Sequence, residues 1–175
     1  MKQPLNKDSY EDIGFAKLDV TRENRTGTSE AIYCAGKTKE QLLKILQTFK
    51  EKGCSVLGTK CSQEQADFVI KTMPDACYNE TAKIISVKAK DAKKSGGKRH
   101  GMVAVCCAGP ADLPIAEEAA LTAEFYGAKV CRHYDVGIAG LHRLLSKIED
   151  IRKADVIIAV AGMEGALAGV IAGLT

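Results

Sequence analysis

Apolar residues recur at helical spacing in the first half of the chain. Thr38 followed by Gln41 matches the capping box that begins a helix, and Gly53 is a residue of the kind that ends one. We therefore expect a helix between Thr38 and Gly53. Its apolar face is formed by Leu42, Leu43, Leu46 and Phe49.

The same pattern repeats further along. Ser62 and Gln65 form a second capping box and predict a helix over about 63–72, before a turn at Pro74 and Asp75. Short apolar runs on either side predict strands over 54–60 and 83–89. Residues 1–30 are polar and rich in turn residues, and they show no clear periodicity. The N-terminal region is therefore expected to be a small α/β unit.

The second half alternates apolar strand runs with helical patterns more regularly. Such alternation predicts right-handed βαβ crossovers, and hence an α/β fold with a doubly wound parallel sheet. We expect strands over 102–108, 129–135 and 155–162, and helices over 113–126, 141–153 and 163–174. Asp112 is the candidate cap of the first of these helices, with Pro114 in its first turn.

A basic, glycine-containing stretch separates the two halves. Residues 88–101 contain many lysines and no large apolar residue, which is typical of a flexible, solvated linker. A nucleic-acid patch is the alternative, but no aromatic residue lies among these lysines. We expect an N-terminal region over 1–90, a linker over 91–101 and a second domain over 102–175.

Composition narrows the class of protein. Apolar residues make up 46% of the chain, whereas aromatic residues make up 5% and Trp is absent, so the core must consist of small aliphatic side chains. The net charge of +3 says little about partners. No apolar run could span a membrane and no signal peptide is visible, so we expect a cytoplasmic protein without membrane or nucleic-acid partners.

The cysteines show neither disulfide nor zinc spacing, which favours reduced thiols that fill the core. Cys106 and Cys107 are adjacent, so on a strand they face opposite sides of the sheet. The seven cysteines are Cys34, Cys54, Cys61, Cys77, Cys106, Cys107 and Cys131.

Three glycine-containing loops follow the predicted strands of the second half. Carboxyl ends of parallel strands meet at one edge of a sheet, where open α/β folds bind ligands. Glycine lets a ligand approach the backbone, although these glycines could also serve only tight turns. No GxGxxG, P-loop or Gly-x-Ser-x-Gly pattern is present. The candidate binding residues are Gly109, Asp112, Asp135, Gly137, Gly140, Gly162, Met163 and Gly165 in these loops, and Arg143 shortly after the second loop.

Glu164 and His142 are the candidate catalytic residues. Glu164 is the only charged residue from Val156 to Thr175, which favours a site carboxylate. Its alternative role is an acid in the first turn of a helix, stabilised by the helix dipole. His142 follows the second loop and precedes Arg143, and its alternative is a capping or solvent-exposed histidine.

The strings AGPADLPIAEEAALTAEFYGAKVCRHYDVGIAGLHRLL and ADVIIAVAGMEGALAGVIAGL closely resemble the LarB family, as does GFAKLDVTRENRTGTSEAIYCAGKTKEQ upstream. The similarity runs from about Gly14 to Leu174. LarB proteins are PurE-related carboxylases that begin the synthesis of the nickel-pincer nucleotide of lactate racemase. The resemblance implies a PurE-like fold and a homo-oligomer.

The resemblance also implies a reaction. The family carboxylates C5 of the pyridinium ring in nicotinic acid adenine dinucleotide and hydrolyses the phosphoanhydride. The products are pyridinium-3,5-biscarboxylic acid mononucleotide and AMP. Carbon dioxide or bicarbonate is the co-substrate, no cofactor is certain, and Mg²⁺ is compatible with the chemistry.

By that similarity, Glu164 is the site carboxylate, His142 lies where PurE enzymes keep a catalytic histidine, and Asp112 ends the loop for the mononucleotide phosphate. That loop carries Pro110 and Ala111 where the family has hydroxyl residues. Beyond Thr175 the resemblance implies further elements and a nucleophilic cysteine, so we expect a PurE-like domain that is cut short. The alternatives are an aminoimidazole ribonucleotide carboxylase or mutase, and a non-catalytic nucleotide-binding or oligomerisation module.

Overall fold

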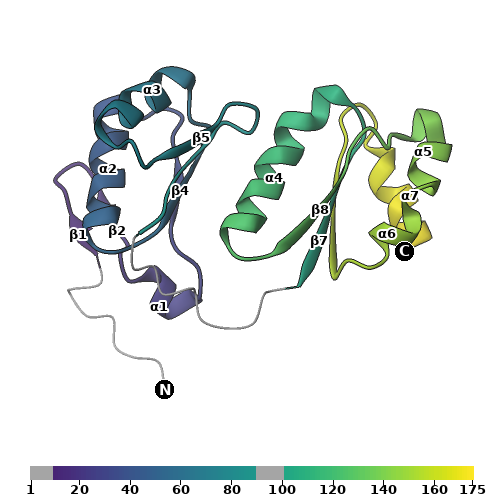
Figure 1. Cartoon of the computed structure of the whole chain (residues 1–175), viewed down its shortest axis with the longest axis horizontal. Coiled ribbons are helices and arrows are strands. Elements are labelled where there is room, and N and C mark those ends of the chain that lie inside the picture. The colour runs from purple at the N-terminus through teal and green to yellow at the C-terminus, as the bar shows by residue number, and fades with distance from the viewer. Residues whose placement is uncertain (1–9, 90–100) are drawn as a thin grey trace. The chain divides into compact units, whose positions relative to one another are not determined.

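The computed structural model describes residues 10–89 and 101–175, and the chain divides into two compact units (Figure 1). The first unit spans Met1–Gly96 and the second spans Gly97–Thr175. Each unit has a sheet and a hydrophobic core of its own. The linker predicted over 91–101 lies outside the described residues, apart from Gly101.

The first unit is a mixed α/β structure. Its elements are β1 (Glu11–Asp12), β2 (Lys17–Leu18), α1 (Arg22–Thr26), β3 (Ala31–Tyr33), α2 (Lys39–Glu51), β4 (Val56–Thr59), α3 (Gln63–Thr72), β5 (Cys77–Asn79) and β6 (Ile84–Val87). β1 pairs with β2, and the other strands form a sheet in the order β3–β4–β6–β5. β3 and β4 are parallel, whereas β6 is antiparallel to both of its neighbours.

Both predicted capping boxes are present at the helix starts. The Gln41 N–H donates to Thr38 Oγ1 at 3.2 Å, and the Thr38 N–H donates to Gln41 Oε1 at 3.0 Å. Ser62 and Gln65 repeat these two bonds at the start of α3. The apolar faces of α2 and α3 pack on the sheet, and the buried apolar residues of the two helices are Leu42, Ile45, Leu46, Phe49, Ala66 and Val69.

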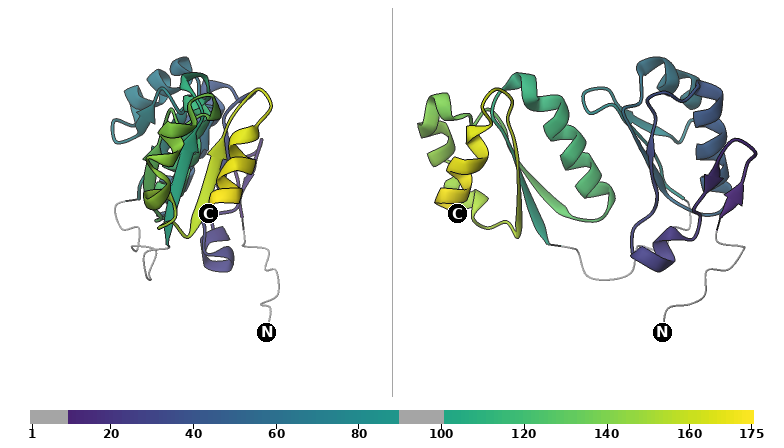
Figure 2. Two further views of the ribbon diagram at one scale, coloured as in Figure 1. Left: turned by 90° about the vertical axis from the view of Figure 1, so that its right-hand side faces the viewer. Right: turned by 180° about the vertical axis from the view of Figure 1, so that it is seen from behind.

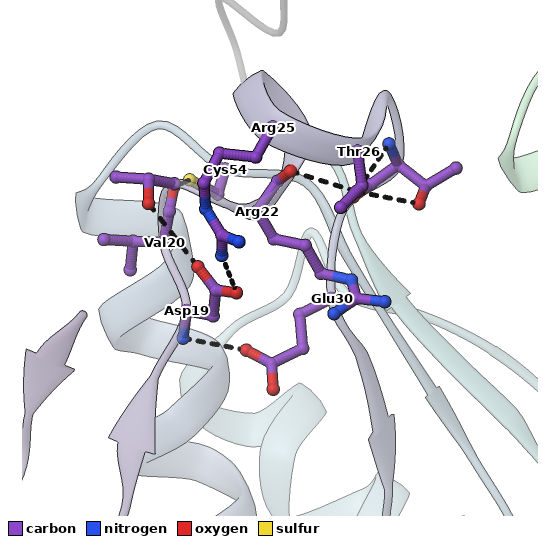
Figure 3. Close-up of polar contacts among 9 residues, drawn as sticks. Asp19, Val20, Arg22, Arg25, Thr26, Glu30 and Cys54 are labelled. Atoms are coloured by element: carbon purple, nitrogen blue, oxygen red, sulfur yellow. Dashed lines mark hydrogen bonds and ion pairs between the residues drawn. The ribbon is translucent and has the colours of Figure 1, made fainter. Parts of the chain in front are cut away.

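Polar contacts hold the segment between β2 and β3, where the sequence has no apolar period (Figure 3). The Asp19 N–H donates to Glu30 Oε2 at 2.9 Å, and the Asp19 carboxylate pairs with the Arg25 guanidinium. Cys54 Sγ donates to Val20 O at 3.3 Å, which ties the segment to the loop after α2. Hydrophobic periodicity could not predict this region because its order comes from side chain–backbone bonds.

The second unit is the expected doubly wound parallel α/β structure. Its elements are β7 (Met102–Cys107), α4 (Leu113–Phe125), β8 (Lys129–His133), α5 (Leu141–Leu145), α6 (Ile148–Ile151), β9 (Val156–Val160) and α7 (Ala166–Leu174). Single 3-10 turns precede α4 and α5. Among the described residues the sheet has three parallel strands in the order β8–β7–β9.

The helices of this unit cover opposite faces of the sheet. α4 lies on one face, and α5, α6 and α7 lie on the other (Figures 1 and 2). The prediction that Cys106 and Cys107 face opposite sides is confirmed. Cys106 belongs to the core with Leu144, Leu167 and Ile171, whereas Cys107 belongs to the core with Ala116 and Ala120.

Two local expectations are wrong. The helix predicted over 141–153 is split into α5 and α6, because Lys147 N–H bonds to Leu144 O in a tight turn while Ser146 Oγ donates to Arg143 O. The helix predicted over 163–174 begins only at Ala166, since Met163 and Gly165 adopt positive φ angles of 50° and 67°.

The apolar face of α7 packs within the second unit. Leu167 and Ile171 are buried against the sheet, with Val170 and Leu174 packed beside them. No helix within residues 10–89 and 101–175 combines the length and the apolar character that crossing a membrane requires.

Candidate functional site

The loops after β7, β8 and β9 share one edge of the second sheet. They are residues 108–112, 135–140 and 161–165, and they follow strands that all run in the same direction. The first loop leads to α4 on one face, whereas the other two lead to helices on the opposite face (Figures 1 and 2). Open α/β sheets bind ligands beyond the carboxyl ends of strands whose connections diverge in this way.

Gly137 fixes the second loop against the first. The Val136 N–H donates to Cys107 O at 3.0 Å, and the Gly137 N–H donates to Ala108 O at 2.9 Å. A Cβ atom on Gly137 would stand 2.7 Å from the Ala108 carbonyl oxygen. The close approach of the two backbones therefore requires glycine at this position.

Asp112 closes the first loop and meets the third. Its Oδ2 accepts a hydrogen bond from the Gly109 N–H at 3.2 Å. A Cβ atom on Gly162 would stand 3.3 Å from Asp112 Oδ1, so the carboxylate lies against the third loop. The side chain does not cap α4 as predicted, because the 3-10 turn over Pro110–Asp112 leads directly into that helix and the carboxylate turns back to Gly109.

An ion pair joins the start and the end of the second loop. Arg143 Nη1 lies 2.5 Å from Asp135 Oδ1, and both side chains are partly exposed. A Cβ atom on Gly140 would stand 2.7 Å from Arg143 Nε, so the guanidinium lies over this glycine. An exposed pair of this kind adds little stability, about 0–1 kcal/mol, and leaves a cation at the rim of the loops.

Cys107 is buried in the core, as the sequence analysis predicted, and it also lies at the end of β7 beside the first loop. Its Sγ donates to Gly109 O at 3.1 Å. Burial raises the pKa of the Cys107 thiol, and the charges of Asp112 and Asp135 raise it further, while backbone N–H groups partly oppose them. The only sequence signal was its position at the end of a strand, next to the first loop.

The two candidate catalytic residues lie at the surface of this unit. Glu164 is exposed in the turn before α7, which the Gly165 N–H closes by donating to Gly162 O at 2.9 Å. Glu164 directly precedes the N-cap Gly165, so it does not lie in the first turn of α7 as the alternative interpretation supposed. His142 is exposed in the first turn of α5, and Met163 is fully exposed.

His133, at the end of β8, is a further residue that sequence reasoning missed. Its Nε2 is the one buried side-chain nitrogen or oxygen atom among the described residues that has no hydrogen-bond partner. Burial lowers the pKa of His133, Asp150 opposes that shift, and Lys147 adds to it. Nothing in its position on an edge strand distinguishes it by sequence.

The first unit has a depression of about 450 Å³ where α2 and α3 begin. Lys39 Nζ and Glu64 Oε1 form an ion pair of 2.9 Å across it. Gln65 Nε2 donates to Cys34 O and Lys37 O and links its two walls. The wall residues are Ala35, Gly36, Lys37, Thr38, Lys39, Glu40, Lys60, Ser62, Glu64 and Gln65.

Nowhere in residues 10–89 and 101–175 do three His, Cys, Asp or Glu side chains gather in a way that could hold a metal ion.

Comparisons with known proteins agree with the two-unit architecture. The family model of the LarB/PurE-like N-terminal domain matches residues 10–90. An uncharacterized protein of Methanocaldococcus jannaschii is 37% identical over an alignment of 183 positions, which covers 99% of this chain and 70% of that relative. The N5-carboxyaminoimidazole ribonucleotide mutase of the same organism is 36% identical over 77 residues, which cover 42% of this chain and 46% of the mutase.

Proposed function

This chain belongs to the LarB/PurE-like family, and from that premise we propose that it carboxylates the pyridinium ring of nicotinic acid adenine dinucleotide and hydrolyses the phosphoanhydride of this substrate. The products are pyridinium-3,5-biscarboxylic acid mononucleotide and AMP. The co-substrate is carbon dioxide or bicarbonate.

The observation that carries the proposal is the meeting of three loops at the carboxyl edge of β8–β7–β9. Asp112 lies against Gly162, and Gly137 lies against Ala108, so loops distant in sequence meet at one end of the strands. Connections to both faces of the sheet begin there, as they do at the ligand sites of open α/β folds. Such loops suit a nucleotide, whose phosphate can approach the backbone at the glycines.

Charged side chains at this edge suit the substrate. Arg143 supports phosphate binding, because its guanidinium is exposed at the second loop beside Asp135. Glu164 is the proposed site carboxylate and is open to solvent. A carboxylate beside a pyridinium ring stabilises the cation by Coulomb attraction.

The carboxylation step needs a nucleophile, because the pyridinium ring is electron-poor. A thiolate of the kind that the family resemblance implies adds to the ring carbon next to C5. C5 then forms the C–C bond to carbon dioxide and loses its proton, and departure of the thiolate restores the pyridinium ring. Glu164 or His142 accepts that proton. In the hydrolysis step, water attacks phosphorus and AMP leaves with the electrons of the broken P–O bond.

Cys107 is a poor candidate for the nucleophilic cysteine that the family resemblance implies. A thiol attacks as its thiolate. Burial and the neighbouring carboxylates Asp112 and Asp135 raise the pKa of Cys107 and disfavour that form. We assign Cys107 a packing role beneath the first loop.

The test is incubation of the purified protein with the dinucleotide and ¹⁴C-bicarbonate, with Mg²⁺ and separately with a chelator. We expect label in a mononucleotide product and equimolar AMP. A protein that binds the dinucleotide but produces neither product would be a nucleotide-binding module, and the enzymatic proposal would fail.

Similarity to N5-carboxyaminoimidazole ribonucleotide mutase supports a second candidate function. The same loops would then hold an aminoimidazole ribonucleotide and move its carboxyl group. Conversion of N5-carboxyaminoimidazole ribonucleotide, measured in parallel with the dinucleotide, separates the two enzymes.

A further inference from the structure

Two buried cysteines meet at the carboxyl ends of the parallel strands of the first unit. Cys34 directly follows β3, and Cys61 is the second residue after β4. Both side chains are fully buried in the same core, and the two thiols hydrogen-bond to each other. Cys34 and Cys61 are therefore a pair, although 27 positions separate them in the sequence.

The backbone fixes this contact on both sides. The Cys34 N–H donates to Thr59 O at 2.9 Å, which continues the pairing of β3 with β4. The Cys61 N–H donates to Lys83 O at 2.8 Å. The register of β3 with β4 therefore sets Cys34 beside Lys60, the residue before Cys61, where neighbouring strands lie about 4.8 Å apart.

The close packing around Cys34 directs its sulfur toward β4. A Cβ atom on Gly58 would stand 2.7 Å from Cys34 Sγ, so glycine leaves the space that the thiol occupies. The Cys34 thiol therefore lies on the β4 side of its strand, in the core that it shares with Cys61.

The shared hydrogen bond shifts the pKa values of the two thiols in opposite directions. The bond to Cys61, together with burial, raises the pKa of Cys34 well above its usual range. The same bond lowers the pKa of Cys61, because the Cys34 S–H stabilises a Cys61 thiolate. Cys61 is therefore the more nucleophilic sulfur of the pair, and Cys34 is its proton-bearing neighbour.

We propose that Cys34 and Cys61 form an oxidisable dithiol, which a small hydroperoxide converts into an intrachain disulfide. The Cys61 thiolate attacks a peroxide oxygen, the O–O bond breaks, and Cys61 becomes a sulfenic acid. The Cys34 sulfur then attacks the Cys61 sulfur, the S–O bond breaks, and the Cys34 proton leaves with the hydroxyl group as water. The two sulfurs lose two electrons and the peroxide gains them.

Such a disulfide would tie together the starts of two helices. Cys61 immediately precedes the Ser62 cap of α3, and the Cys34 carbonyl accepts from Gln65 Nε2 at 3.1 Å. Residues 35–40 and 60–65 carry the walls of the depression between these helices. Oxidation would therefore restrict the two walls.

The experiment treats the native full chain with hydrogen peroxide, blocks the remaining thiols by alkylation, and maps the peptides by mass spectrometry without reduction. We expect a linked peptide that contains Cys34 and Cys61, lighter than its reduced parts by two hydrogen atoms and cleaved by dithiothreitol. We also expect the unfolding midpoint of the first unit to rise by about 5–10 °C.

Two variants make the result specific. Cys34→Ser removes the partner, so a dimedone adduct should appear on Cys61 in place of the linked peptide. Cys106→Ser is the matched control, because Cys106 is equally buried and burial alone raises its pKa to about 11. This variant should form the Cys34–Cys61 link at the wild-type level.

The mapping of the wild-type chain decides the matter even if a variant folds poorly. The proposal is overturned if peroxide oxidises the exposed Cys77 while Cys34 and Cys61 are both recovered as alkylated thiols after denaturation. It is equally overturned if either cysteine links to a different partner.

Discussion

The carboxylate of Asp112 lies against Gly162, so that a Cβ atom on the glycine would stand 3.3 Å from Oδ1. The contact joins the first and third loops at the proposed nucleotide site. Gly162→Ala should push the carboxylate aside and weaken binding of nicotinic acid adenine dinucleotide roughly 3- to 10-fold, which corresponds to about 0.6–1.4 kcal/mol. Calorimetry measures the change.

The matched control for this prediction is Gly169→Ala, because a Cβ atom there meets nothing within 4 Å. The control should bind the dinucleotide as the wild type does. Equal affinity of all three proteins would show that the Asp112–Gly162 contact lies outside the binding surface.

Gly137 offers a test of stability at the same edge. A Cβ atom would stand 2.7 Å from the Ala108 carbonyl oxygen, and a backbone atom cannot move aside cheaply. Gly137→Ala should lower the free energy of unfolding by about 1–3 kcal/mol, as measured by urea denaturation. Gly169→Ala, in the middle of α7, should be neutral or stabilising by up to about 1 kcal/mol. Similar midpoints for these two variants would refute the close approach.

His133 should make stability depend on pH. Burial lowers its pKa in the folded state, so the unfolded chain binds the proton more readily. Stability should therefore fall as pH decreases through the ordinary histidine pKa of about 6.5. His133→Leu should flatten the decline between pH 7 and pH 5 in urea titrations.

His142→Gln is the control for the pH experiment, because it removes an exposed imidazole. This variant should keep the wild-type decline. If the stability of His133→Leu fell by the same amount between pH 7 and pH 5, the decline would come from other groups.

The outer strand β9 of the second sheet is the expected site of self-association. Within the described residues β9 pairs only with β7, and Val156 at its start is 55% exposed. Unpaired strand edges with apolar side chains promote association. We expect light scattering to show a homo-oligomer, and Val156→Lys to shift it toward smaller species. A wild-type protein that is monomeric at every concentration would contradict this expectation.

Sequence patterns predicted those elements whose order comes from local signals. The capping residues Thr38 and Ser62 predicted the starts of α2 and α3, and continuous apolar runs predicted β7 and β9. The arrangement around Asp19 escaped prediction because its partners, Arg25 and Glu30, act through specific polar geometry.

The candidate site was predictable as a set of loops but not in its contacts. Parallel strands fix the edge at which Gly109, Gly137 and Gly162 gather. The closure of the first loop by Asp112 and the position of Cys107 depend on the 3-10 turn before α4, which has no clear sequence signal. The start of α7 was misplaced because Met163 adopts a positive φ that is uncommon for its residue type.

The most direct test of the account compares the wild type with Glu164→Gln in the ¹⁴C-bicarbonate assay. The substitution keeps the size of an exposed side chain and removes its charge, so the fold should be unchanged. The account predicts label in the mononucleotide product of the wild type and a loss of roughly 100- to 10,000-fold in the variant. Equal incorporation of label by the two proteins, or no incorporation by the wild type with nicotinic acid adenine dinucleotide, would contradict it.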